Sequence, residues 1–174
     1  MIKRLFNKKK LKELDKFIIF DLEYTAWESS LKNKWSNPGE YREIIEIGAV
    51  FSSKKKNFNV IKEFNVLVLP SINYDLSDYI TKLTGIRNED LKKKGISFGL
   101  AYTQFIKFIK KHSRCVFAYG DDVKVLKENI KINKLPDNFE DRLFHNIRPI
   151  IESELSIKKD TIDSSQLNKY LGIK

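Results

Sequence analysis

The chain has 174 residues, with 33 Lys and Arg against 23 Asp and Glu, and a formal net charge of +10. Its 41% hydrophobic and 32% charged residues are ordinary for a globular protein, which excludes a disordered or fibrous chain and fits one domain with its own core. No apolar run approaches the roughly 20 residues that span a bilayer.

Two further features of the composition bear on location and partners. The basic start lacks the apolar stretch of a signal peptide, and the single cysteine, Cys115, excludes a disulfide framework. We therefore expect a cytoplasmic protein with a basic N-terminal extension over residues 1–15 and a single domain over 16–174. The excess of lysine is consistent with a nucleic-acid partner, but equally with an AT-biased coding sequence, because Arg is scarce.

The first half of the chain predicts three strands. The run FIIF at 17–20 is typical of a strand buried on both faces. After a polar segment over 24–42, which contains both tryptophans, strands are predicted at 43–51 and 60–70, the latter closed by Pro70. The short KKKN turn between these two strands indicates an antiparallel meander.

The second half alternates helices with strands. Helical patterns cover 76–84, stopped by Gly85, and 98–112, and a fourth strand is predicted at 115–119. A helix then starts after Asp122, a fifth strand is expected at 142–147, and helices follow at 149–155 and 163–171. The order predicts an α/β fold in which a mixed five-stranded sheet, with three antiparallel strands first, is flanked by helices.

One pair of carboxylates lies on an apolar strand. Side chains alternate along a strand, so Asp21 and Glu23 point to the same face, about 7 Å apart. Two such acids repel each other unless a divalent cation lies between them. The alternative is a strand that simply ends in solvent with both acids hydrated.

A second acidic pair, Asp121 and Asp122, follows the fourth strand and opens a helix. Asp is also a favoured helix N-cap, which would account for the pair without any metal. If the first and fourth strands are neighbours, however, Asp122 joins Asp21 and Glu23 in one cluster. Such an oxygen-rich cluster suits Mg²⁺ or Mn²⁺ and is poorly suited to zinc.

Four segments together resemble the DEDD superfamily of 3′–5′ exonucleases. They are FDLEYTAWE at 20–28, EIIEIGAV at 43–50, LSDYITKLTGI at 76–86 and FAYGDDVKVLKENI at 117–130. The resemblance is to the histidine-containing branch, which includes the Eri1-like, KapD-like and proofreading-subunit-like exonucleases. Asp21 and Glu23 match the first motif. Val125 and Leu126 follow Asp122 as the second motif requires, so Asp122 is the match and Asp121 the alternative ligand.

The resemblance implies an RNase H-like fold and hydrolysis of RNA or single-stranded DNA from a 3′ end by a two-metal mechanism. Asp21, Glu23 and Asp122 would hold the two ions. The segment that contains Leu22, Tyr24, Thr25 and Trp27 would bind the terminal nucleotide. Trp27 and Trp35 would stack on bases, or else pack the long loop against the domain.

The third motif of this branch, H-x-x-x-x-D, is not found. The segment QLNKYLGI at 166–173 matches the helix that precedes it, so we expect the domain to be incomplete at its C-terminal end. Neither His112 nor His145 has the context of that motif. Two hypotheses result: a metal-dependent exonuclease, or a catalytically impaired module of the same fold that binds nucleic acid or a protein partner.

Overall fold

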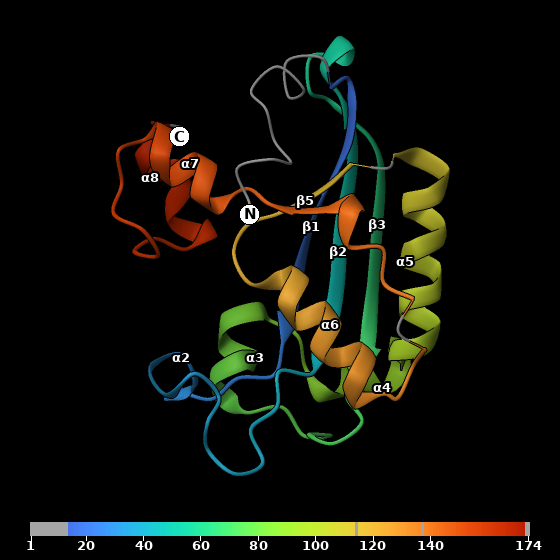
Figure 1. Cartoon of the computed structure of the whole chain (residues 1–174). Helices are drawn as coiled ribbons and strands as arrows, with labels where there is room; N and C mark the ends of the chain where they lie inside the picture. The colour runs from blue at the N-terminus through green and yellow to red at the C-terminus, as the bar shows by residue number, and fades with distance from the viewer. Residues whose placement is uncertain (1–13, 114, 137, 173–174) are drawn as a thin grey trace.

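The computed structural model describes residues 14–113, 115–136 and 138–172. Within this part of the chain six strands form one sheet in the order β4-β3-β2-β1-β5-β6 (Figure 1). The strands are β1 (Lys16–Tyr24), β2 (Ile44–Ser53), β3 (Val60–Leu69), β4 (Ile96–Ser97), β5 (Val116–Ala118) and β6 (Phe144–Asn146).

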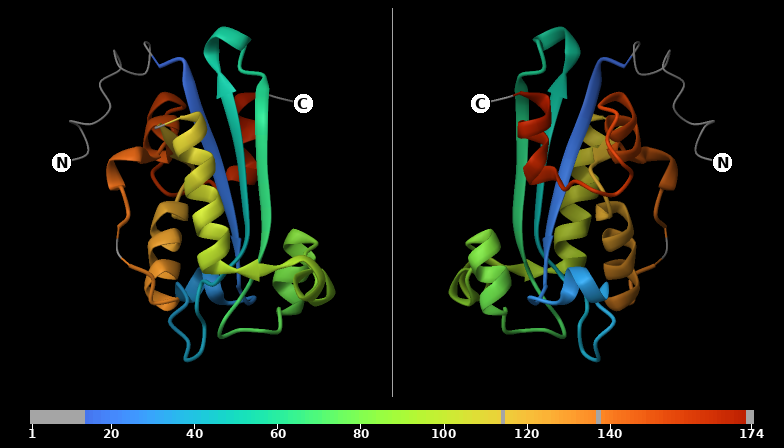
Figure 2. Two further views of the ribbon diagram at one scale, coloured as in Figure 1. Left: turned by 90° about the vertical axis from the view of Figure 1, so that its right-hand side faces the viewer. Right: turned by 90° about the vertical axis from the view of Figure 1, so that its left-hand side faces the viewer.

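Helices connect and cover these strands (Figures 1 and 2). The α-helices are α2 (Ser30–Asn33), α3 (Asp78–Thr84), α4 (Asn88–Lys94), α5 (Phe98–His112), α6 (Asp122–Ile132), α7 (Arg148–Glu154) and α8 (Leu167–Leu171). Short 3-10 helices occur at η2 (Lys54–Lys56), η3 (Asp141–Leu143) and η4 (Ser164–Gln166).

The sheet is mixed, as predicted. β1 pairs antiparallel with β2, and β2 pairs antiparallel with β3, which confirms the meander. β5 lies parallel to β1 on its other side, and β6 lies parallel to β5. The C-terminal ends of β1 and β5 therefore meet at one end of the sheet, which is the condition on which the expected carboxylate cluster depends.

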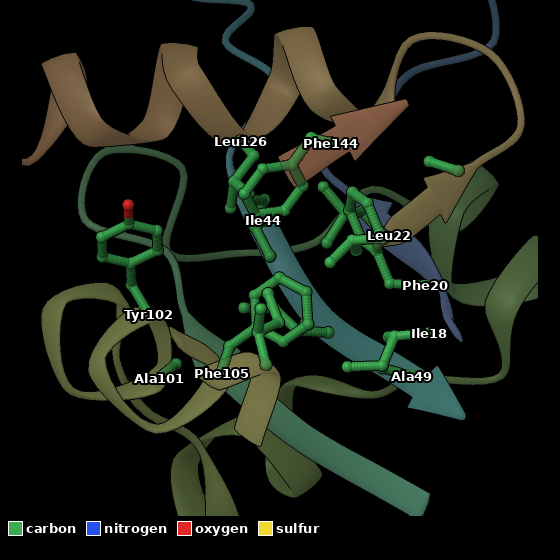
Figure 3. Close-up of a cluster of buried hydrophobic side chains, with 14 of the residues drawn as sticks. Ile18, Phe20, Leu22, Ile44, Ala49, Ala101, Tyr102, Phe105, Leu126 and Phe144 are labelled. Carbon is green, nitrogen blue, oxygen red and sulfur yellow. The ribbon is translucent and has the colours of Figure 1, made fainter. Parts of the chain in front are cut away.

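The main core lies between the sheet and the helices α5 and α6. Ile18, Phe20 and Leu22 of β1 are buried there against Phe105 and Leu126 (Figure 3). The prediction that residues 17–20 are buried on both faces is wrong, because Ile19 on the opposite face is 41% exposed. The strand alternates, and the helices α5 and α6 cover the even-numbered side chains only.

The sheet has one more strand than predicted. The additional strand is β4, a two-residue strand that pairs in parallel with Val68 and Leu69 of β3. So short a segment has no periodicity to detect, and the helix α4 before it was not predicted either. The expected strand at 142–147 begins later, because residues 141–143 form the 3-10 helix η3.

The predicted ends of helix α3 illustrate local capping. The helix starts two residues later than predicted, because the Ser77 side chain accepts a hydrogen bond from the Ile80 amide and acts as the N-cap. It ends at Gly85, whose φ of 75° is the left-handed C-cap that the sequence indicated. The basic extension predicted for residues 1–15 lies almost entirely outside the described residues.

Candidate active site

The carboxylates of β1 stand on the face of the sheet opposite the main core. Asp21 and Glu23 alternate with the buried Phe20 and Leu22, so both acids point away from the helices α5 and α6. In the register of β1 with β2, Glu23 lies directly opposite Glu46. Glu46 is thus a third acid beside the predicted pair, and sequence analysis missed it because strand register is a tertiary property.

The second acidic pair, Asp121 and Asp122, follows β5 at the same end of the sheet. Gly120 follows this strand with a φ of 97°, a conformation that favours glycine, and the chain turns there into α6. The Gly120 amide donates to the Asn146 side chain over 3.1 Å, which fixes the turn against the end of β6. The start of α6 thereby lies near β1 (Figure 1), and Asp121 and Asp122 line one cavity with Asp21 and Glu23.

The two neighbouring aspartates differ in their surroundings. Asp122 is buried, with 5% of its surface exposed, and its Oδ2 atom has no hydrogen-bond partner. The side chain of Asp121 is exposed and lies 3.2 Å from the Arg42 guanidinium. The side chain of Asp121, the N-cap residue of α6, makes no capping hydrogen bond, so capping does not account for the pair.

These acids line a cavity of about 550 Å³ between β1, the helix α3 and the start of α6. Its polar floor is formed by Asp21, Glu23 and Asp122, with Asp121 and Arg42 beside them. Its other side chains are mainly apolar or aromatic. The apolar and aromatic ones are Leu22, Tyr24, Ala26, Leu31, Trp35, Tyr79, Ile80, Leu83 and Tyr119, and the polar ones are Arg148, Asp163, Ser164 and Ser165.

Crowding of negative charge changes the protonation of the cluster. Burial, and then the charges of Asp21 and Glu23, raise the pKa of Asp122 to about 8. Burial, and then Asp21 and Glu46, raise the pKa of Glu23 to about 7. Partial desolvation in the cavity and the charge of Glu46 raise the pKa of Asp21 as well. The cluster therefore holds protons that a cation would displace.

The carboxylate oxygens of the cluster are ligands that a hard cation prefers, although the side chains are not yet arranged as a metal site. Among the described residues, no group of three His, Cys, Asp or Glu side chains is close enough to hold a metal ion as it stands. The unpartnered Asp122 Oδ2 and the carboxylate-only donors nevertheless fit Mg²⁺ or Mn²⁺. A divalent cation would offset the repulsion among their ionised carboxylates.

The residues expected to bind the terminal nucleotide divide into two groups. Leu22 and Tyr24 line the cavity, whereas Thr25 and Trp27 are absent from its walls. The buried Thr25 hydroxyl instead donates to the Tyr41 carbonyl and accepts from the Glu43 amide over 3.0 Å. The Trp27 amide donates to Ser30 Oγ over 2.8 Å. Thr25 and Trp27 therefore shape the loop behind the cavity.

The second tryptophan does line the cavity. Trp35 donates from Nε1 to the Thr25 carbonyl over 2.9 Å, and its ring lies 5.6 Å from the Tyr24 ring. The Arg42 guanidinium covers Trp35 at 5.5 Å, and its charge is paired with Glu128 as well as with Asp121. Sequence analysis missed Arg42, since its partners on α6 are about 80 residues away in the chain.

Arg148 was also missed. It lines the cavity, lies over the Tyr119 ring at 5.3 Å, and pairs with the buried Glu152 at 3.2 Å. It also donates to the Ile162 carbonyl, and so holds the following residues, 163–165, against the cavity. The only signal in the sequence was the spacing of Arg148 and Glu152, which lie four residues apart on one helix.

Neither histidine lies at the cavity. His112 stacks on the Phe51 ring at 5.0 Å, at the far end of α5, and burial lowers its pKa. His145 lies in β6, 5.9 Å from the Phe117 ring. Both placements agree with the expectation that neither residue is the histidine of the third motif.

The chain can be assigned to a family of known proteins. The exonuclease family model, RNase_T, matches residues 18–160. The chain belongs to the exonuclease family. The resemblance to exonucleases is thereby confirmed. A curated relative, the 3′-5′ exonuclease eri1 of Schizosaccharomyces pombe, is 31% identical over 142 residues, which are 72% of this chain and 44% of the relative. The chain thus spans less than half the length of that relative.

Solved structures show the same fold. The nuclease domain of 3′hExo, a DEDDh family member bound to rAMP, has a TM-score of 0.63 and 22% identity, and the match covers 92% of this chain and 88% of that one. A 3′-exonuclease recognising the histone mRNA stem-loop has a TM-score of 0.74 at the same identity, over 92% and 72% of the two chains. Cell-death related nuclease 4 has a TM-score of 0.72 and 17% identity, over 92% and 56%. The RNase H-like fold expected for this family is thus confirmed.

Among the residues that the structure describes, none of the helices combines the length and the apolar character needed to span a bilayer.

Proposed function

We propose that this protein is a metal-dependent 3′–5′ exonuclease that hydrolyses the phosphodiester bonds of RNA or single-stranded DNA. The observation that carries the proposal is the cluster of Asp21, Glu23 and Asp122 on the floor of a cavity large enough for a nucleotide-sized ligand. Buried acids of raised pKa in a cavity are costly to the fold, and such a cost is typical of functional sites.

The acids supply the ligands that this chemistry needs. Two divalent ions, Mg²⁺ or Mn²⁺, would stabilise the charge on the attacking and departing oxygens of the phosphodiester. Asp21 is proposed to hold both ions, Glu23 the one on the side of the attacking water, and Asp122 the other. Asp121 remains the alternative ligand, although in the free protein it is paired with Arg42.

The walls of the cavity suit a terminal nucleotide. Leu22, Leu31 and Leu83 offer apolar surface to a base, and the Tyr24 and Trp35 rings, 5.6 Å apart, also line the cavity. Aromatic stacking contributes about 1–3 kcal/mol per base and tolerates any sequence. A single unpaired 3′ end is therefore the proposed substrate, with the terminal base between these side chains and its phosphate at the acids.

The relatives support nucleic acid as the substrate. The fission-yeast relative is named a 3′-5′ exonuclease, and one structural neighbour recognises the stem-loop of histone mRNA. We further propose that residues 16–174 form one exonuclease-like domain preceded by a basic extension. The lone thiol, Cys115, suits a reducing location such as the cytoplasm.

A specific observation favours a second candidate, a catalytically impaired module that binds nucleic acid or a protein. Among the described residues no histidine lines the cavity, so the general base of this family has no counterpart there. Such a module would keep the cavity and bind single strands there without hydrolysing them.

The experiment compares 5′-labelled oligonucleotides that carry a free or a blocked 3′ hydroxyl, in Mg²⁺ and Mn²⁺, together with circular single strands. The exonuclease predicts a ladder of shortened products from the free 3′ end only, and no ladder with Asp21→Asn. Internal cuts in circles would reject the exonuclease. Binding without any shortening would favour the impaired module.

A further inference from the structure

A second cavity, of about 400 Å³, adjoins the first at the side of α6. The two cavities share Trp35 and Arg42, so the stacked pair of these side chains forms the wall between them. The second cavity lies between α6 and the loop that follows α2, and the views in Figures 1 and 2 place this loop beside that helix.

The charge of this second cavity is opposite to that of the first. Lys34, Lys124 and Lys131 line it, and all three side chains are exposed. In the part of the chain that the structure describes, none of the three forms an ion pair with an acid. By contrast, the Arg42 charge is already met by Glu128. The cavity thus presents three cations that no described acid pairs with, while its other carboxylate, Glu40, accepts hydrogen bonds from Ser30 and Asn37.

The arrangement follows from the sequence of α6. Lys124 and Lys131 are seven residues apart, two helical turns, and so stand on the same side of the helix. Glu128 lies between them and is occupied by both guanidinium contacts from Arg42. The exposed Tyr41 ring completes the cavity with a flat surface beside the lysines.

We propose that this second cavity binds the phosphates and bases of the strand immediately 5′ to the nucleotide held in the first cavity. The inference rests on the proposed function, and it names the path that the remaining strand takes. When the 3′ end of a strand lies in the first cavity, the phosphates upstream of it are attracted to the exposed cations of the adjoining cavity. The Trp35–Arg42 wall separates the two subsites, and Tyr41 provides a face on which an upstream base stacks.

The test measures single-strand binding as a function of salt. The Asp21→Asn protein, in Mg²⁺, is titrated with a dinucleotide and with an octanucleotide between 50 and 300 mM salt. The same is done after adding Lys34→Gln, Lys124→Gln and Lys131→Gln together. The matched control is Lys55→Gln, Lys56→Gln and Lys62→Gln, which removes the same charge at the other end of the sheet. A Lys→Arg triple at 34, 124 and 131 keeps the charge.

The proposal predicts that the slope of log K against log salt for the octanucleotide falls by about 0.7 per lysine, or about 2 in all. The dinucleotide should lose less affinity, the control triple should follow the parent protein, and the Arg triple should retain the slope. An unchanged octanucleotide slope, or an equal fall in the control triple, would overturn the proposal. If the wild-type chain still shortens 3′ ends in that case, the proposed function stands without this subsite. A chain that neither binds nor shortens single strands would overturn both.

Discussion

Asp121 and Asp122 are adjacent in the sequence, yet one is 59% exposed in its side chain and paired with Arg42 at 3.2 Å, while the other is buried without a partner for its Oδ2. The turn at Gly120 produces this difference, since it directs the second carboxylate toward β1 and the first toward the loop that precedes β2. The pair therefore offers a matched comparison within one turn of helix.

Metal affinity should depend on one of these aspartates much more than on the other. Asp122→Asn removes a ligand from the cluster, so we expect at least a tenfold weaker binding of Mn²⁺. Asp121→Asn alters an exposed ion pair and should change the affinity by less than threefold. Calorimetric titration of Mn²⁺ into both variants measures this. Equal losses would show that Asp121 takes part as the alternative ligand.

The raised pKa values predict an unusual pH dependence of stability without metal. A carboxyl whose pKa is higher in the folded than in the unfolded state stabilises the fold when it is protonated. This stabilisation is complete at a pH below the unfolded-state pKa, and it is lost as the pH rises through the folded-state pKa. For Asp122 this loss runs from about pH 3.8 to about 8. In EDTA, the Tm of Asp122→Asn should thus equal or exceed that of the wild type at pH 8, and its advantage should shrink toward pH 5.

Added Mg²⁺ should reverse this order at pH 8, because the ion binds the ionised carboxylates of the wild type. Thermal melts at pH 5, 6.5 and 8, with EDTA or Mg²⁺, test the linkage. A wild type in EDTA that grows more stable than Asp122→Asn between pH 5 and 8 would contradict the account.

Much of the site could be predicted from local patterns. The alternation of β1 put Asp21 and Glu23 on one face, and the spacing from Asp122 to Val125 and Leu126 singled out Asp122, the buried aspartate of the pair, by its resemblance to the second motif. Glu46 and Arg42 could not be found in this way. Glu46 reaches the cluster through strand register, and Arg42 through contacts with residues far away in the chain.

A buried structural carboxylate next to the site carries its own prediction. Glu43 is fully buried and accepts four hydrogen bonds, from the Ser71 amide and hydroxyl and from the amides of Ile72 and Asn73. Glu43→Gln loses the charge that strengthens these bonds, so we expect the free energy of unfolding to fall by about 1–3 kcal/mol. The exposed Glu63→Gln should change it by less than about 0.5 kcal/mol. Urea denaturation compares the two, and similar values for both variants would refute the structural role of Glu43.

The third motif of the family supplies a prediction about rate. Neither His112 nor His145 is followed by Asp at the fifth position, and neither lines the cavity. A positioned base typically contributes 10²–10⁴-fold to a rate. Fusing a helical segment with H-x-x-x-x-D after Lys174, from the native reading frame or from a relative, should raise the rate of hydrolysis of the 174-residue chain within this range. The same segment with its histidine changed to alanine is the control. Equal rates with and without the segment would mean that another residue provides the base.

The most direct test of the central claim is metal-dependent hydrolysis of a 5′-labelled single strand by the wild type, Asp21→Asn and Asp122→Asn, with Asp121→Asn as the neighbouring control. We expect product ladders from the 3′ end that require Mg²⁺ or Mn²⁺. We also expect a loss of at least 10²-fold in rate for Asp21→Asn and Asp122→Asn, and little loss for Asp121→Asn. Ladders that persist in EDTA, or that are as strong in Asp21→Asn and Asp122→Asn as in the wild type, would refute the assignment of these acids as metal ligands.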